Sequence, residues 1–141
     1  ANTLGHGDDS GLYTGTRVLN AAFLDRFASV IRMKHLDQQN EVEVLMRRVP
    51  ECGEDLARKL VGVAAAVRQA AENDQVFCTF STRRLIDVAR KRFQLGSLVQ
   101  ALKVGLLSRL APDDRSVVKE ILQRHLGDIL QAETGGESDE D

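Results

Sequence analysis

Residues 53–71 read GEDLARKLVGVAAAVRQAA, and this stretch decides the fold of the chain. Apolar side chains recur there at the spacing of one helix face over about four turns. The positions on that face are Leu56, Leu60, Val63, Ala64, Val67 and Ala71. The pattern predicts a long amphipathic α-helix beginning near Gly53. One buried face needs partners to pack against, and the flanking sequence supplies them.

The segment before this helix carries a second helical pattern. Asp37 is a favourable N-cap, and Pro50 stops the helix that follows it. One buried stripe comprises Val42, Leu45, Met46 and Val49. Further upstream, residues 28–36 alternate between Ile31, Met33 and the polar side chains beside them, which predicts a short strand.

Three further helices are predicted downstream. Ser81 and Thr82 cap residues 83–93, Gly96-Ser97 turns the chain into a helix from Leu98, and Pro112 starts a last helix that ends at Gly127. The inward positions are Leu85, Ile86, Ala89 and Phe93, then Leu98, Leu102, Leu106 and Leu110, then Val117, Val118, Ile121, Leu122 and His125. Residues 76–80 form a short apolar run that fits either a strand or a plug beneath the next element. Five amphipathic helices with short connections predict a small helical bundle.

Bulk composition fits a globular domain. The 141 residues are 43% apolar and 28% charged. No apolar stretch is long enough to cross a membrane and no signal peptide is evident, so we expect a cytoplasmic protein without a membrane partner. Cys52 and Cys78 lack the spacing of a zinc site or disulfide framework and are expected to be buried free thiols.

Charge is distributed unevenly along the chain. Residues 83–124 hold ten basic and four acidic side chains, yet the aromatic residues of a nucleic-acid stacking platform are missing. We therefore interpret these charges as solvated helix faces and consider a nucleic-acid partner unlikely. Residues 128–141 carry six acidic and no basic residues, which predicts a disordered acidic tail.

No sequence motif points directly to catalysis or metal binding. No glycine-rich phosphate loop with a lysine is present, so the chain alone is predicted to be inactive and to bind no cofactor. His6, His35 and His125 share no ligand spacing, and Asp8-Asp9 in a glycine-rich loop is typical of a turn. We expect no metal site.

The N-terminal stretch carries a resemblance. Asn2-Thr3 is followed by the loop GHGDDSGLYTGT at residues 5–16 and by NAAFLDRF at residues 20–27. This region resembles the part that follows the Walker B strand in AAA+ ATPases of the MoxR and dynein-related group, and in particular CobS-like proteins, named for the ATPase subunit of cobaltochelatase. Through Ser81-Thr82-Arg83 and the helices after it, the resemblance extends more loosely to about Gly127.

The resemblance implies roles for three residues. Asn2 matches sensor 1, which positions the attacking water. Arg26 matches the arginine finger that reaches the nucleotide of the adjacent subunit. Arg83 matches the sensor 2 arginine at the start of a lid helix, although Thr82 stands where the family has proline and the adjoining Arg84 is an alternative.

The implied architecture is mainly α, a helical lid bundle preceded by a remnant of an AAA+ α/β core. Its expected parts are the core remnant at residues 1–36, the lid at 37–127 and the acidic tail at 128–141. The Walker motifs would precede Ala1, so we read the chain as a C-terminal fragment. The resemblance implies a parent that forms a ring, expected to be a hexamer, and that uses ATP and Mg²⁺ for remodelling or metal insertion with a von Willebrand A-domain partner. The alternative is a stand-alone helical interaction module without catalytic activity.

Overall fold

The computed structural model describes residues 18–29, 31 and 33–135, in two units that we treat separately, Ala1–Lys34 and His35–Asp141. The helices and short 3₁₀ turns are α1 (Ala21–Leu24), α2 (Gln38–Arg48), η1 (Pro50–Cys52), α3 (Gly53–Glu72), α4 (Thr82–Leu95), α5 (Leu98–Gly105), η2 (Leu107–Arg109) and α6 (Pro112–Gly135). No strand forms in these described ranges. The mainly α prediction is confirmed, while Asn2 and the loop after it lie outside the described residues. The predicted domain boundaries stay predictions.

Local capping explains where the helices of the second unit begin. The side chain of Asp37 accepts a hydrogen bond from the Asn40 amide at 3.0 Å, and Ser97 accepts one from the Gln100 amide at 3.3 Å. These caps satisfy backbone N–H groups that have no partner within the helix. The predicted starts of α2 and α5, and the stop at Pro50, are therefore confirmed.

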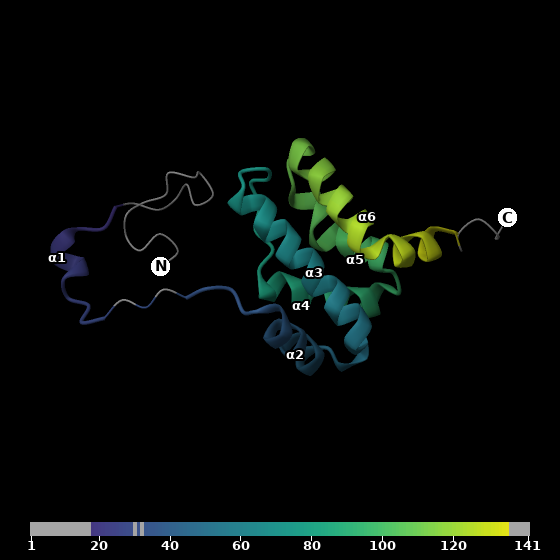
Figure 1. Cartoon of the computed structure of the whole chain (residues 1–141), viewed down its shortest axis with the longest axis horizontal. Helices are drawn as coiled ribbons and strands as arrows, with labels where there is room; N and C mark the ends of the chain where they lie inside the picture. The colour runs from purple at the N-terminus through teal and green to yellow at the C-terminus, as the bar shows by residue number, and fades with distance from the viewer. Residues whose placement is uncertain (1–17, 30, 32, 136–141) are drawn as a thin grey trace. The chain divides into compact units, whose positions relative to one another are not determined.

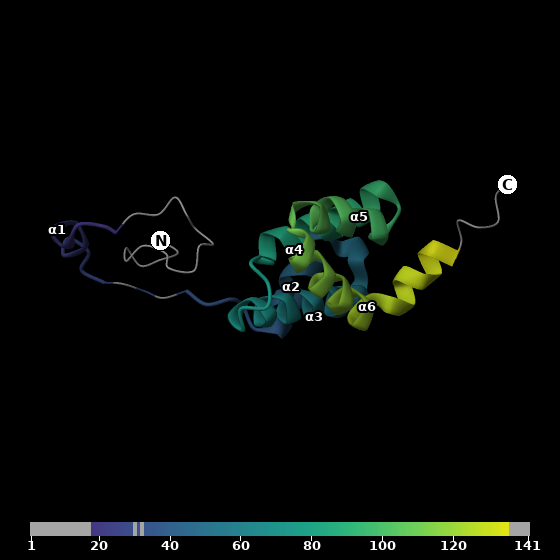
Figure 2. The same cartoon turned by 90° about the horizontal axis from the view of Figure 1, so that it is seen from above.

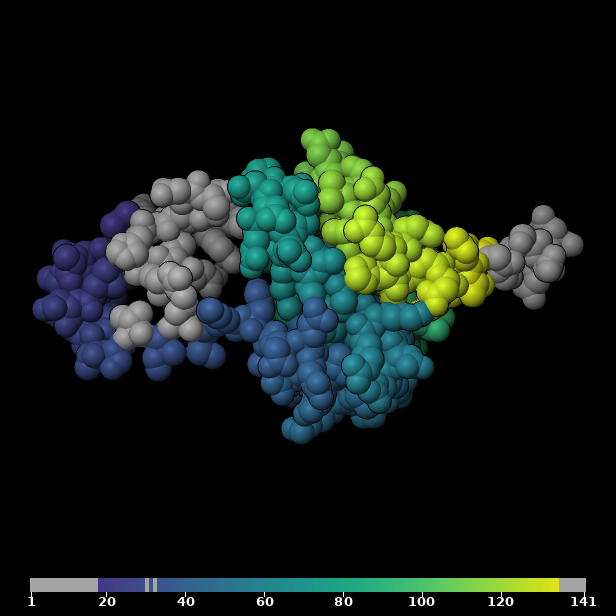
Figure 3. All heavy atoms as spheres, in the orientation of Figure 1, coloured from purple at the N-terminus to yellow at the C-terminus, as the bar shows by residue number. Residues whose placement is uncertain are grey.

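The central element of the second unit is α3, as its sequence predicted. It packs against α2 and α6, and α4 packs against α5 (Figure 1 and, turned by 90°, Figure 2). In Figure 3 the side chains of α6 lie directly against those of α3. A Cβ on Gly62 would lie 3.2 Å from Nδ1 of His125, so this glycine lets α6 approach α3 closely. Fully buried side chains from all five helices, including Leu45, Leu60 and Leu126, form one core.

The apolar run before α4 is a plug and not a strand. Its side chains alternate, with Val76, Cys78 and Phe80 buried, whereas Phe77 is 67% exposed. Extended backbone turns successive side chains to opposite sides, so one side of the run fills the core even though no ladder forms. Phe80 is completely buried, which fixes the chain immediately before α4.

The last helix differs from its prediction. α6 does not end at Gly127 but continues to Gly135, so residues 128–135 are helical and not part of a disordered tail. Ile129 and Leu130 pack against the core, and Lys59 of α3 forms an ion pair with Asp128. These contacts offset the roughly 1 kcal/mol that glycine costs inside a helix. Residues 136–141 lie outside the described part.

Two smaller predictions are wrong. Phe93 was expected to face inward but is 42% exposed. Val88, which was not among the expected inward positions, is completely buried. The strand predicted at residues 28–36 does not form at 28, 29, 31 or 33–36. Ile31 and Met33 are 78% and 86% exposed. A strand needs a neighbour to satisfy its backbone groups, and none pairs with these described residues.

Among the described residues, no helix combines the length and the apolar character needed to cross a membrane.

Candidate functional site

The start of α4 presents two adjacent arginines in different ways. Ser81 is the N-cap, and its hydroxyl accepts a hydrogen bond from the Arg84 amide at 3.4 Å. The Arg84 side chain folds back, and its Nη1 donates to the Thr79 carbonyl at 2.9 Å. Arg83 is exposed and lies on a different face of the same turn. The local geometry thus gives Arg84 a structural partner and leaves Arg83 available at the surface.

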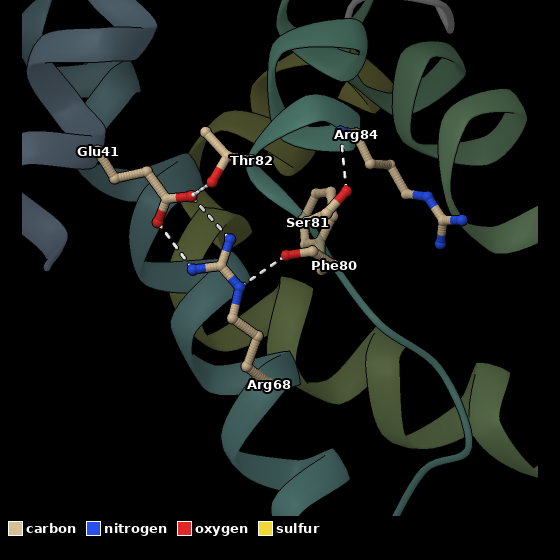
Figure 4. A network of polar contacts seen from close by, with 6 residues as sticks. All are labelled: Glu41, Arg68, Phe80, Ser81, Thr82 and Arg84. Carbon is tan, nitrogen blue, oxygen red and sulfur yellow. Dashed lines mark hydrogen bonds and ion pairs between the residues drawn. The ribbon is translucent and has the colours of Figure 1, made fainter. Parts of the chain in front are cut away.

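A buried polar network connects α2, α3 and the first residue of α4 (Figure 4). Arg68 donates two parallel hydrogen bonds to the Glu41 carboxylate, at 2.8 and 2.7 Å, and a third from Nε to the Phe80 carbonyl at 2.7 Å. The hydroxyl of Thr82 donates to the same carboxylate at 2.6 Å. The Glu41 side chain is 0% exposed and that of Arg68 is 10% exposed. Three segments distant in sequence therefore meet at one carboxylate.

The network stabilises the charged form of Glu41. Burial by itself would raise the pKa of this carboxyl, but the hydrogen bonds from Arg68 and Thr82 and the positive charge of Arg68 lower it. The net pKa lies below the ordinary value, so Glu41 is ionised at neutral pH. Because Thr82 directly precedes Arg83, the network also fixes the backbone from which Arg83 projects.

Sequence reasoning did not identify Glu41 or Arg68. Each is a charged residue beside an apolar stripe, Glu41 next to Val42 and Arg68 next to Val67. A charge at the edge of a buried stripe is a usable signal, since buried charges are normally paired. The signal does not name the partner, which lies 27 residues away in the chain.

A surface hollow of about 310 Å³ lies between α2 and α4. It is lined by Arg48, Arg83, Ile86, Asp87 and Arg90. Within the described part of the chain none of its three arginines takes part in an ion pair. The hollow thus gathers three positive charges against the single carboxylate of Asp87, an arrangement that attracts anions.

Arg26 belongs to the first unit, in which Asn20 caps α1 by accepting a hydrogen bond from the Ala22 amide at 2.8 Å. Arg26 follows the helix and is exposed. The rings of Phe23 and Phe27 meet edge to face, with centroids 5.4 Å apart. This contact joins side chains on either side of Arg26. Asn2 lies outside the described residues.

Metal and thiol chemistry find little support in the described residues. No group of three or more His, Cys, Asp or Glu side chains there could hold a metal ion. Cys52 and Cys78 are buried free thiols, as predicted. Burial raises the pKa of Cys52 to about 11, and burial together with the nearby Asp114 carboxylate raises that of Cys78. Both thiols are therefore protonated at neutral pH.

A carboxylate from α6 occupies the start of α5. Glu133 accepts hydrogen bonds through Oε2 from the amides of Leu98 and Val99, at 2.7 and 3.1 Å, and from the Ser97 hydroxyl at 2.9 Å. Its other oxygen lies 3.3 Å from Nε of Arg92. A negative charge is favourable at a helix N-terminus, so this contact holds the last turns of α6 on the bundle.

Comparison with known proteins gives matches that cover the helical part of the chain. A family model described as CbbQ/NirQ/NorQ C-terminal matches residues 41–126, which run from the buried carboxylate of the network to the core of α6. Aerobic cobaltochelatase subunit CobS from Sinorhizobium sp is 32% identical over 131 residues. That alignment covers 90% of this chain but 40% of the relative, so the chain spans well under half of the relative's length. No solved structure matches.

Proposed function

Because the chain belongs to the CbbQ/NirQ/NorQ C-terminal family, we propose that it is the C-terminal part of a ring-forming AAA+ ATPase of the CobS-like group. Residues 37–127 act as the lid of that ATPase, which couples ATP hydrolysis to remodelling or metal insertion. The observation that carries the proposal is the position of Arg83, unpaired among the described residues at the capped start of α4 in a hollow rich in arginine.

The donor set suits a phosphate ligand. Guanidinium groups bind phosphate oxygens through several directed N–H donors, and Arg48, Arg83 and Arg90 present three of them. The described residues offer no carboxylate cluster for Mg²⁺, so residues elsewhere in the parent would hold that ion. When bound in the parent, ATP with Mg²⁺ supplies the phosphoryl group whose transfer releases the energy for remodelling.

In this proposal Arg83 is the sensor 2 residue. It binds the terminal phosphate when the lid closes on its own subunit, and so links nucleotide state to lid position. The network of Glu41, Arg68 and Thr82 supports it by fixing the first turn of α4. Thr82 takes the place of the proline in the related motif, and its hydroxyl supplies the anchoring that proline's rigid backbone would give.

Arg26 and Asn2 complete the proposed machinery. Arg26 acts as the arginine finger toward the neighbouring subunit of the ring, and its exposure at the end of α1 is compatible with contact to a second chain. Asn2 positions the attacking water as sensor 1. A von Willebrand A-domain protein is the proposed partner of the ring.

The experiment is an ATPase assay of the intact parent with Arg83→Ala. Loss of a charged contact to phosphate should lower turnover or ATP affinity by roughly 10- to 100-fold, from 1.5–3 kcal/mol for a hydrogen bond to a charged group. Arg58→Ala is the matched control, because Arg58 lies on the exposed face of α3 and its ion-pair partner among the described residues is Glu54. If both variants behave like the wild type, Arg83 has no role in catalysis and the proposal fails.

Arg26 is tested in the same assay. Arg26→Ala should leave nucleotide binding nearly intact and reduce turnover by roughly 10³-fold or more, as expected for an arginine finger. Subunits that keep Arg26 but lack the Walker lysine should partly rescue subunits without Arg26. A complete absence of rescue would mean that Arg26 does not act across the subunit interface.

A further inference from the structure

Three arginines on two helices face one hollow without a matching set of carboxylates. Arg48 is the last residue of α2, and Arg83 and Arg90 lie on α4. The neighbouring Arg47 pairs with Glu43 at 3.5 Å, but no such pair forms for Arg48 within the described part. All three arginines are exposed, so solvent screens their mutual repulsion, but the local excess of positive charge attracts anions.

The spacing along α4 indicates the kind of anion. Arg83 and Arg90 are seven residues apart, which puts them on the same face two turns from each other, with about 10 Å between their positions along the axis. Asp87 lies between them, one turn from each. A single phosphate bound beside one arginine would leave the other unpaired, whereas a chain of phosphates can reach both, although it must pass the opposing carboxylate of Asp87.

The second helix is tied to α4, so the backbones on the two sides of the hollow are held relative to each other. Arg48 reaches it from α2, and α2 is joined to the start of α4 through the buried carboxylate of Glu41 and the hydroxyl of Thr82. The two walls therefore do not move independently. Preorganised donors of this kind bind an anion at a smaller entropic cost than arginines on separate mobile segments.

We propose that the hollow of Arg48, Arg83 and Arg90 is a binding site for a linear polyphosphate, with Arg48 and Arg90 as ligands beside Arg83. The inference rests on the proposed function in that it shares Arg83, but it assigns phosphate contacts to two further residues. The same chemistry is present in the triphosphate of a nucleotide and in inorganic triphosphate. If arginine side chains alone recognise the ligand, both a nucleoside triphosphate and inorganic triphosphate should bind, because no part of the hollow is specific for a base.

The test is a titration of the 141-residue chain with sodium triphosphate, followed by the NMR signals of backbone amides and arginine side chains. Saturable shifts centred on Arg48, Arg83 and Arg90 are expected, with a Kd on the order of 1 mM. Inorganic monophosphate should bind at least several-fold more weakly, and ATP about as well as triphosphate. Much tighter binding of ATP would show that a base is also recognised and would overturn a site made of arginine alone.

Single substitutions in the hollow are expected to change triphosphate affinity in opposite directions. Arg48→Ala and Arg90→Ala should each weaken triphosphate binding about three- to tenfold, and Asp87→Asn should strengthen it severalfold because the opposing charge is lost. Arg58→Ala, on the exposed face of α3, should leave binding unchanged. Equal affinity for all four variants, or shifts spread over every surface arginine, would overturn the proposal and indicate nonspecific charge attraction.

The binding experiment and the ATPase assay of Arg83→Ala can fail independently. If triphosphate does not bind the hollow but Arg83→Ala still impairs the intact parent, Arg48 and Arg90 are not ligands and the sensor role of Arg83 survives. If triphosphate binds as expected but Arg83→Ala leaves turnover of the parent unaffected, the hollow is a polyphosphate site and the sensor role is rejected.

Discussion

Replacement of Arg68 by methionine removes the counter-charge of a fully buried carboxylate. Arg68 makes three hydrogen bonds of 2.7–2.8 Å, two to Glu41 and one to the Phe80 carbonyl. Methionine keeps much of the apolar stem, so lost packing contributes little. Of its hydrogen bonds to described residues, the Glu41 carboxylate, 0% exposed, then keeps the one from Thr82. Removal of one partner from a buried ion pair costs about 3–5 kcal/mol, and we expect Arg68→Met to lower the free energy of unfolding by that amount.

The assay is urea denaturation at pH 7, followed by far-UV circular dichroism because the chain has no tryptophan. The denaturation midpoint should fall and the slope should stay unchanged. Arg58→Met is the control, since its pair with Glu54 has both side chains more than half exposed, and it should change stability by no more than about 0.5 kcal/mol.

The pH dependence gives a second, independent readout. In the wild type the pKa of Glu41 is lowered by folding, so its contribution is complete above about pH 5 and is lost as the pH falls through the folded pKa. Without Arg68, burial dominates and raises the pKa of Glu41, so protonation stabilises the folded variant as the pH falls. The difference between wild type and Arg68→Met should therefore shrink between pH 7 and pH 4.

A double variant tests the same pair even if Arg68→Met does not fold. Arg68→Met with Glu41→Leu replaces the buried pair by apolar side chains and should recover at least about 2 kcal/mol of the loss. A cost below about 1 kcal/mol for Arg68→Met at pH 7, or strictly additive effects of the two substitutions, would show that Glu41 and Arg68 are not energetically coupled.

Three further predictions follow from single contacts. Thr82→Val should lower the free energy of unfolding, measured by urea denaturation, by about 1.5–3 kcal/mol, because the Thr82 hydroxyl donates to the charged Glu41. Thr82→Ser keeps the donor and should lower it less than half as much. Equal losses for the two variants would contradict this role. Glu133→Gln should speed amide hydrogen exchange at Leu98, whose N–H donates to the carboxylate at 2.7 Å, while unchanged protection would mean that α6 is held by other contacts. Cys52, with its pKa raised to about 11, should react with a thiol reagent at pH 8 only after unfolding, and rapid modification of the folded chain would refute its burial.

The sequence by itself determined the helices of the second unit, because their signals are local. Asp37 and Ser97 cap helices whose amides lie three residues away, and Pro50 stops a helix through its own ring. The buried stripe of α3 follows from side-chain spacing within one element. The resemblance at Ser81-Thr82-Arg83 also involves adjacent residues, but it was interpreted together with the stretch at residues 2–27. The roles of Asn2, Arg26 and Arg83 themselves remain predictions.

Tertiary structure decided the contacts between residues that are far apart in the chain. The carboxylate of Glu41 meets Arg68 and Thr82 across 27 and 41 residues, and Glu133 meets Leu98 across 35. The contact between Glu133 and Leu98 is one reason why α6 continues beyond Gly127, where the local sequence pattern predicted the end of the helix.

The strand expected at residues 28–36 failed for the same reason. Alternation describes the faces of a strand but cannot supply the neighbour that its backbone requires, and the described residues 28, 29, 31 and 33–36 are in no ladder. The hollow of Arg48, Arg83 and Arg90 likewise exists only because α2 and α4 pack together, which brings charges 35 and 42 residues apart in the chain to one place. Helix propensity and capping act within a few residues, whereas the partner of a buried charge or a strand is chosen by the whole fold.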